Sequence, residues 1–359
     1  MARVKLPVQD FRTRTLHGKL DMNSLSRPKL QIGAGLETTQ VIDAGARYGL
    51  HPTWRAYDAP LGYHMFEPDP AEAERLRAKY SSQADSIVVH QMALGETAGT
   101  VTLNIMRHRG LNSIKRPNPK ATWFSISHPG EAEIVDQVTV GMTTIDESAA
   151  DAGIEFDFLK CDVEGSAYDV LAGAHRQLHS AILGVRSEVD FIPVYEGCRT
   201  FGEVDGLLRE NGFALMSLET NGAGAPVNGY HLGGRFGYLE TSDGIWIKPF
   251  EWLSDNSGWS ANRVAVAAFK LSAFCFCNGV TDVAIQYLEK AAATVGDQIP
   301  RMAETDLYKT VDRFVQKLFK DLEARMVFSE VELDATYRSI FGKERKKRHE
   351  FYEDPNLNP

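Results

Sequence analysis

The sequence has little of three features that would each indicate a special class of protein. It contains only four cysteines in 359 residues, too few for a disulfide framework, which favours a reducing compartment. Basic residues are in the minority, 39 against 48 acidic ones, so the formal net charge of −9 argues against nucleic acid as the main partner. No apolar run approaches the ~20 residues that a membrane span needs, and the charges within residues 1–20 argue against a secretory signal. We therefore predict a cytoplasmic protein without a membrane span.

The remaining composition is that of an ordinary globular chain, with 43% hydrophobic and 24% charged residues. From Gln40 onward, short apolar runs alternate with helical stretches, which predicts an α/β domain with a largely parallel sheet. After Trp259 the pattern becomes entirely helical. The predicted organisation is an N-terminal arm or lid, an α/β domain, a helical extension and a charged tail, at residues 1–38, 39–254, 255–342 and 343–359.

Hydrophobic periodicity locates the individual elements. Strands are expected at residues 41–45, 63–66, 86–90, 100–106, 134–143, 156–161, 181–188, 213–218 and 244–247, the last at an edge, with about seven forming the main sheet. Helices are expected at residues 70–80, 145–152, 163–178 and 200–211, and in the extension at 264–277, 282–295, 307–326 and 329–342. The aperiodic stretch 107–133 is predicted to be a long loop, of the kind that often closes over an active site.

A glycine turn follows the first expected strand. Asp43, Gly45 and Gly49 allow a tight strand-to-helix turn and close approach of a ligand to the backbone. Glu67 ends the next strand, where a carboxylate can bind ribose hydroxyls. Asp43 replaces the first glycine of a dinucleotide motif and would repel pyrophosphate, which favours the cationic S-adenosylmethionine over NAD. A purely structural turn is the alternative interpretation.

A second group of charged residues follows the strand expected at 156–161. Lys160, Asp162 and Glu164 stand at its carboxyl end, where open α/β sheets bind ligands. Asp162 also suits the N-cap of the next helix, with Glu164 in the first turn, so capping is the alternative role. Lys160 within a buried strand requires a partner, for which Asp157 or a neighbouring acid of the crevice is available.

Four blocks of the sequence, in this order and spacing, resemble the FkbM-type S-adenosylmethionine-dependent methyltransferases. They are VIDAGARYGLH, HMFEPDP, ALGETAGTVTL and TTIDESAADAGIEFDFLKCDVEGSAYDVLAGAHRQL. The resemblance covers about residues 40–249 and implies a seven-stranded Rossmann-like methyltransferase fold and O-methylation, often of a sugar or a secondary metabolite. Arg47 departs from the family, which commonly has asparagine there. The helical region after residue 255 lies outside the resemblance.

The resemblance also implies roles for individual residues. The three residues of the glycine turn would line the methionine part of the cofactor, Glu67 would bind its ribose, and Met92 and Ala93 would border its adenine. Asp162 would lie near the cofactor's amino group or the acceptor. The complete implied cofactor set is Asp43, Gly45, Gly49, Glu67, Met92, Ala93 and Asp162.

Methyl transfer to a hydroxyl gains from a general base, because a hydroxyl is a poor nucleophile. The candidate catalytic residues are Asp162, Glu188 and His108, with Glu164 and His128 as further possible bases. Contacts to the acceptor are expected from Asn112, Ser113, Lys160, Glu164 and His128. The chain has no strong metal-binding pattern, although several acids at one crevice could hold Mg²⁺.

Two other classes of function stay open at this point, an NAD-dependent oxidoreductase and a cofactor-binding scaffold without turnover. For the favoured methyltransferase, the partner is a small-molecule or glycan acceptor whose identity the sequence does not give. The apolar stripe of residues 307–326 predicts packing on the α/β domain or on a second subunit, with a homodimer contact through the C-terminal helices. An independent helical bundle is the alternative.

Overall fold

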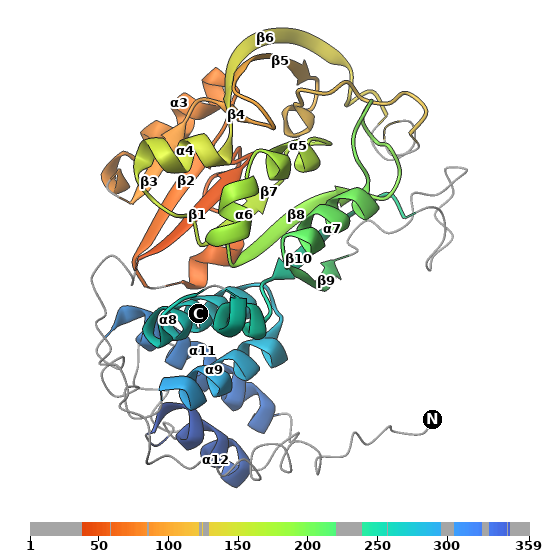
Figure 1. Cartoon of the computed structure of the whole chain (residues 1–359). Coiled ribbons are helices and arrows are strands. Elements are labelled where there is room, and N and C mark those ends of the chain that lie inside the picture. Colours follow the sequence, from red (N-terminus) through yellow and green to blue (C-terminus); the bar gives the residue numbers. More distant parts are fainter. Residues whose placement is uncertain are drawn as a thin grey trace, which may run out of the picture.

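The computed structural model describes residues 38–219, 239–295, 305–324, 330–342 and 344, apart from residues 58, 85, 122–123, 125–128 and 257 (Figure 1). Nearly all of the predicted N-terminal arm and of the charged tail, and His128, lie outside these described residues. Within them, no helix is long and apolar enough to cross a membrane.

The main sheet has seven strands among the described residues, in the order β3-β2-β1-β7-β8-β10-β9. They are β1 (Thr39–Ala44), β2 (Leu61–Phe66), β3 (Ile87–His90), β7 (Phe158–Cys161), β8 (Gly184–Asp190), β9 (Ala214–Glu219) and β10 (Thr241–Ile247). The first five in the order are parallel, and β10 runs antiparallel to both β8 and β9. The predicted seven-stranded Rossmann-like fold is thus confirmed.

The prediction that residues 244–247 form an edge strand is wrong. They belong to β10, which lies between β8 and β9 and leaves β9 at the edge. Ile245, Trp246 and Ile247 are at most 1% exposed, because consecutive residues of an inner strand are covered on both faces of the sheet.

A second, smaller sheet crosses above the carboxyl ends of the main strands (Figure 1). It contains β4 (Ala93–Leu94), β6 (Ile134–Thr143) and β5 (Gly99–Met106), in that order. The connection from β5 to β6 begins with a short 3₁₀ helix, η3 (Arg109–Leu111). This part of the predicted loop therefore lies close to the ligand-binding end of the main sheet.

Helices cover the main sheet from one side through a continuous apolar cluster. The helices that contribute to it are α4 (Ile145–Ala152), α5 (Ala167–Ala172), α6 (His175–Ser180) and α7 (Phe201–Glu210). The single helix expected at 163–178 is instead the pair α5 and α6, preceded by a loop. The helix ends at Gly173, whose backbone touches that of Gly95: an added Cβ would lie 2.0 Å from the Gly95 carbonyl oxygen.

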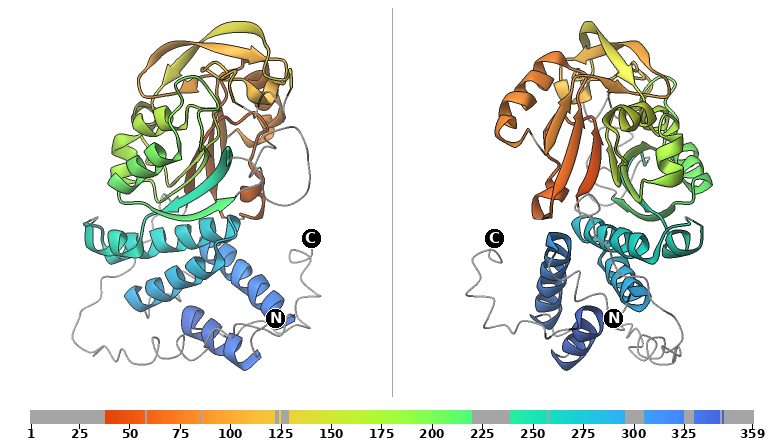
Figure 2. Two further views of the ribbon diagram at one scale, coloured as in Figure 1. Left: turned by 90° about the vertical axis from the view of Figure 1, so that its right-hand side faces the viewer. Right: turned by 60° about the vertical axis from the view of Figure 1, so that its left-hand side comes forward.

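Another apolar cluster joins the sheet to α3 (Pro70–Lys79), to η1 (Pro52–Ala56) and to the C-terminal helices. A π-helical turn, η5 (Trp252–Asn256), leads into that helical part. The C-terminal helices are α8 (Ala261–Cys277), α9 (Thr281–Val295), α11 (Asp306–Ala324) and α12 (Glu330–Phe341). Figure 2 shows α8 lying directly beneath the sheet, with the remaining helices below it. The helical extension is thus confirmed.

Contacts between α8 and the sheet are both apolar and ionic. The rings of Phe274 and Phe158 stack with centroids 4.5 Å apart, and Phe274 also fills the space above Gly184. Lys270 in α8 pairs with Asp157 at 2.7 Å. Because one apolar cluster spans the sheet and all four helices, the helices pack on the α/β part rather than form a separate bundle. A homodimer contact stays a prediction.

Candidate functional site

A hollow at the carboxyl ends of the strands, here called the main hollow, encloses about 700 Å³ including open solvent. Ligand sites in α/β proteins occur at this end of the sheet and are commonly of this size. Its wall includes five of the seven predicted cofactor residues, Gly45, Glu67, Met92, Ala93 and Asp162. It also includes three predicted acceptor residues, Asn112, Ser113 and Glu164.

The glycine turn and the second charged motif meet at Gly45. This residue has φ +80°, and a Cβ atom added to it would lie 1.8 Å from the Asp162 carbonyl oxygen. The backbone N–H of Asp162 in turn donates to the Ala44 carbonyl at 3.0 Å. The close approach predicted for Gly45 is therefore to the chain's own backbone, and substituting this glycine would displace Asp162 as well as affect any ligand.

Asp43 lies beneath the main hollow and does not form part of its wall. Its side chain accepts from the Tyr63 hydroxyl at 2.6 Å and pairs with Lys160 Nζ at 3.1 Å. Burial raises the pKa of Asp43, and Lys160 opposes that rise. Asp43 is thus the partner that a buried Lys160 requires, whereas Asp157, the other possibility, pairs with Lys270.

Lys160 connects this buried pair to the wall of the hollow. Its ammonium group donates to the Gly45 carbonyl at 3.0 Å and lies 3.4 Å from Asp162 Oδ2. Burial acts to lower the pKa of Lys160, but Asp43 and Asp162 outweigh it and raise the pKa above its usual value. Lys160 therefore remains charged and fixes the position of two groups on the wall, although it is not itself exposed there.

Gly49 also lies away from the wall. It has φ +83°, and an added Cβ would lie 2.5 Å from the Tyr80 hydroxyl oxygen. That hydroxyl accepts from the backbone N–H of Leu50 at 2.9 Å. The glycine thus lets the turn pack against the end of α3, a structural task.

Glu67 stands on the wall at the end of β2 and is 4% exposed. Its Oε1 accepts from the backbone N–H of Asp69 at 2.8 Å. Burial raises the pKa of Glu67 to about 7. A buried carboxylate with remaining acceptor capacity suits paired hydroxyls such as those of a ribose.

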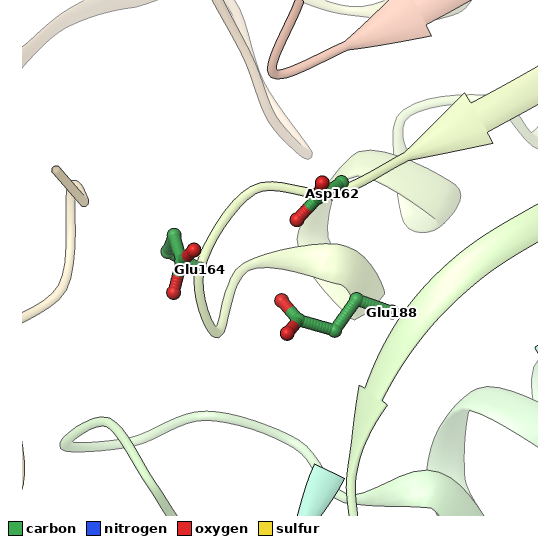
Figure 3. A group of neighbouring side chains, drawn as sticks. All are labelled: Asp162, Glu164 and Glu188. Atoms are coloured by element: carbon green, nitrogen blue, oxygen red, sulfur yellow. The ribbon is translucent and has the colours of Figure 1, made fainter. Parts of the chain in front are cut away.

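Three carboxylates form a group, as Figure 3 shows, and two of them line the main hollow. One oxygen from each of Asp162, Glu164 and Glu188 lies within 4.8 Å of the others. The first two follow β7, and Glu188 projects from the neighbouring strand β8. Oxygen ligands at this spacing are of the kind that Mg²⁺ binds, but Lys160 already supplies a cation 3.4 Å from Asp162.

Glu164 has the one positive φ, +51°, among the described residues other than glycine. Two hydrogen bonds hold it in this sparsely populated conformation. The Ser113 hydroxyl donates to the Glu164 carbonyl at 2.6 Å, and the Tyr195 hydroxyl donates to its carboxylate at 2.5 Å. The alternative role of Asp162 as a helix cap is wrong, because Ser166 occupies the N-cap of α5 and Glu164 lies in the preceding loop.

The crowding of these acids changes their protonation. Burial and the neighbouring Asp162 raise the pKa of Glu164 to about 8. Burial and the neighbouring Glu164 raise the pKa of Glu188 well above its usual value. Both groups also line a second, small hollow together with Asp190 and Arg199. At neutral pH the group therefore retains protons, and Glu164 stands where the two hollows adjoin.

The remaining catalytic candidate, His108, is exposed beside η3 and is not part of the wall of the main hollow. Among the wall residues that sequence reasoning did not select are four polar ones, Arg47, Tyr48, Arg109 and Ser166. Tyr48 is 74% exposed, and the Ser166 hydroxyl is buried without a partner in the described chain. Of these, only Arg47 had given a signal, through its departure from the family pattern.

A largely parallel sheet with a carboxylate-lined hollow beyond its strand ends is typical of the class of Rossmann-like domains, which bind ligands at this place. Residues 43–215 match the model of the methyltransferase FkbM domain, the family that the sequence resembles. No curated protein matches the sequence.

Two solved structures show a weaker likeness. The methyltransferase FkbM from Methylobacillus flagellatus KT is 17% identical with a TM-score of 0.36, over 58% of this chain and 43% of that chain. The tRNA methyltransferase TrmK from B. subtilis is 12% identical with a TM-score of 0.29, over 87% of this chain and 100% of that chain. The chain thus spans less than half the length of the FkbM structure that it resembles.

Proposed function

We propose that this protein is an S-adenosylmethionine-dependent O-methyltransferase that acts on a hydroxyl of a sugar, a glycan or a secondary metabolite. The observation that carries the proposal is the placement of a carboxylate group, Asp162, Glu164 and Glu188, beside a hollow in an FkbM methyltransferase domain. A hydroxyl acceptor needs a base at this position.

The wall of the main hollow fits S-adenosylmethionine. Glu67 suits the ribose hydroxyls, and Met92 and Ala93 offer apolar surface for an adenine. The unpartnered hydroxyl of Ser166 gives a further polar group that a ligand would satisfy. Acidic side chains on the wall favour a cationic ligand over a pyrophosphate, and Arg47 is already paired with Asp69 at 3.2 Å. The match to a methyltransferase domain adds further weight against an NAD-dependent oxidoreductase.

In the proposed methyl transfer, the cofactor and the protein have different roles. S-adenosylmethionine supplies an already activated methyl group when bound, so orientation of the acceptor oxygen and removal of its proton are left to the protein. Asp162 and Glu188 are the proposed catalytic residues, because Asp162 lines the main hollow, Glu188 lines the small one, and one carboxylate oxygen of each lies within 4.8 Å of the other. Lys160 orients Asp162 through their 3.4 Å contact.

Mass spectrometry with deuteromethyl-labelled S-adenosylmethionine tests the proposal. The full chain is incubated with free sugars, glycans and hydroxylated metabolites, and we expect the label on a hydroxyl oxygen. Asp162→Asn should fold and lose most of this transfer, while Glu74→Gln, on the exposed side of α3, should transfer normally. Label found only on nitrogen, sulfur or carbon would contradict O-methylation, and unchanged transfer by Asp162→Asn would remove it from catalysis.

A further inference from the structure

Residues 109–115, here called the strap, follow β5 and contribute Arg109, Asn112 and Ser113 to the wall of the main hollow. We infer that Asn112 and Ser113 are positioning residues that pin the strap across the hollow, from Asp69 beside Glu67 to the backbone of Glu164. The inference deepens the proposed function and rests on the main hollow as the cofactor site. It gives these two residues a role other than binding the acceptor.

The first pin joins the strap to the Glu67 side of the hollow. Asn112 Nδ2 donates to Asp69 Oδ2 at 3.3 Å, and Asn112 Oδ1 accepts from the backbone N–H of Met106 at 2.8 Å. Asp69 is 7% exposed, and its own N–H donates to Glu67 Oε1. Arg47 contacts the same Asp69 oxygen as Asn112 at 3.2 Å. Asp69 thus connects the strap, the glycine turn and the carboxylate proposed for the ribose.

The second pin joins the strap to the acid group. The Ser113 hydroxyl donates to the Glu164 carbonyl at 2.6 Å and accepts from the backbone N–H of Lys115 at 2.9 Å. Ser113 is 2% exposed, and its backbone pairs with that of Asn104 in both directions. Because Glu164 has a left-handed backbone conformation, a fixed donor to its carbonyl helps to hold the carboxylate where it stands.

The hydrogen-bonding capacity of the two side chains supports positioning over contact with an acceptor. A serine hydroxyl has one proton to donate, and that of Ser113 is used within the chain. The amide oxygen of Asn112 is likewise occupied, and one of its two N–H groups points to Asp69. Loss of either side chain should loosen the strap without removing any charge from the hollow.

Hydrogen–deuterium exchange of the full chain without ligand tests the pins directly. Asn112→Ala and Ser113→Ala should each exchange faster within residues 104–115 and keep wild-type protection in β1 and β7. In calorimetry, Asn112→Ala should bind S-adenosylmethionine roughly tenfold more weakly, because binding must then order a strap that is in place for only about a tenth of the time. Asn118→Ala is the matched control, because its side chain bonds to the Pro193 carbonyl, away from the hollow.

An exchange of the Asn112 and Asp69 side chains separates positioning from a general loss of stability. Asn112→Asp places two carboxylates face to face and should release the strap. Combining it with Asp69→Asn removes the repulsion and restores a donor and an acceptor in reversed order, but it also takes from Arg47 the oxygen that it shares with Asn112, so protection of the strap should return in part. Unchanged exchange in both alanine variants, or no recovery in the combined variant, would overturn the inference. Failure of the wild-type protein to bind S-adenosylmethionine would instead contradict the proposed function, since the exchange readout needs no cofactor.

Discussion

The two ends of the main sheet differ in how their buried side chains are stabilised. Beneath the sheet, α8 packs aromatic rings against β7 and neutralises its buried cation, because Lys270 faces Asp157. At the carboxyl end, Glu67 and the acids around Glu164 are crowded or buried so that their pKa values rise. The packing of α8 stabilises the fold through burial of apolar surface. The acids at the carboxyl end lower the stability of the fold while they are held in place as candidate reactive groups.

This difference gives the helical extension a stabilising role, because it shares an apolar cluster with the sheet. A site with poorly compensated acids lowers the stability of the sheet that carries it. The apolar cluster shared by α8 and the strands offsets this cost at the opposite end. The predictions below test whether the two ends respond to substitution and pH as their chemistry requires.

The largest expected effect on stability comes from Phe274→Ala in α8. The ring is 2% exposed and stacks on Phe158, so its loss leaves a cavity and should lower the free energy of unfolding by about 3–5 kcal/mol. Urea denaturation measures this change. Val331→Ala, at a residue 76% exposed, should stay within about 0.5 kcal/mol of wild type. Equal values for the two variants would mean that α8 is not part of the core.

At the carboxyl end of the sheet, Lys160→Met should lower the free energy of unfolding by a similar amount, for a different reason. It leaves Asp43 buried without its counter-ion, and removal of one partner of a buried pair costs about 3–5 kcal/mol. Here the loss should shrink as the pH falls, because Asp43 can take up a proton and become neutral. The loss of stability caused by Phe274→Ala should not depend on pH. If the loss of stability in Lys160→Met were also independent of pH, this would contradict the interpretation as a buried ion pair.

A smaller change of opposite sign is expected from Glu188→Gln. Removing one acid from the group relieves the crowding with Glu164 and should stabilise the protein by about 1 kcal/mol, while turnover falls. Thermal unfolding and the labelled-methyl assay measure the two effects. The exposed Glu74→Gln should change neither. A destabilised Glu188→Gln protein would show that this carboxylate is well compensated.

The pH dependence of stability should also divide between the two regions. Burial raises the pKa of Glu67 to about 7 and that of Glu164 to about 8, so the folded state binds more protons than the unfolded state and stability falls as pH rises from about 5 to 8. Burial lowers the pKa of Lys248, beside η5, to about 7, so this residue adds stability as pH rises from about 7 toward 10. Urea denaturation measures the free energy of unfolding across this pH range. Its rise above about pH 7 should disappear in Lys248→Met, and a rise that persists would contradict the assignment.

The sequence predicted the sheet well because its strands are short, apolar and regularly spaced. It failed at the single helix expected over 163–178, since the contact between Gly173 and Gly95 comes from parts of the chain far apart in sequence. The position of β10 inside the sheet depends on pairing with β8 and β9, which periodicity does not report.

At the site, the sequence located the strand ends but not the direction of each side chain. Asp43 and Lys160 were expected at the ligand, yet they face each other within the sheet because they are register partners in β1 and β7. Asp69 was not predicted as a site residue, because its contacts come from the glycine turn and from the strap, which follows β5. Such convergence is a property of the tertiary fold and leaves no local pattern.

The most direct test of the central claim is calorimetric titration of the full chain with S-adenosylmethionine and, separately, with NAD. We expect S-adenosylmethionine to bind at one site per chain and NAD to give no binding heat. Glu67→Gln should weaken S-adenosylmethionine by about 1.5–3 kcal/mol, the value of hydrogen bonds to a charged group. Preferential binding of NAD, or an affinity for S-adenosylmethionine that Glu67→Gln leaves unchanged, would contradict the assignment of the main hollow.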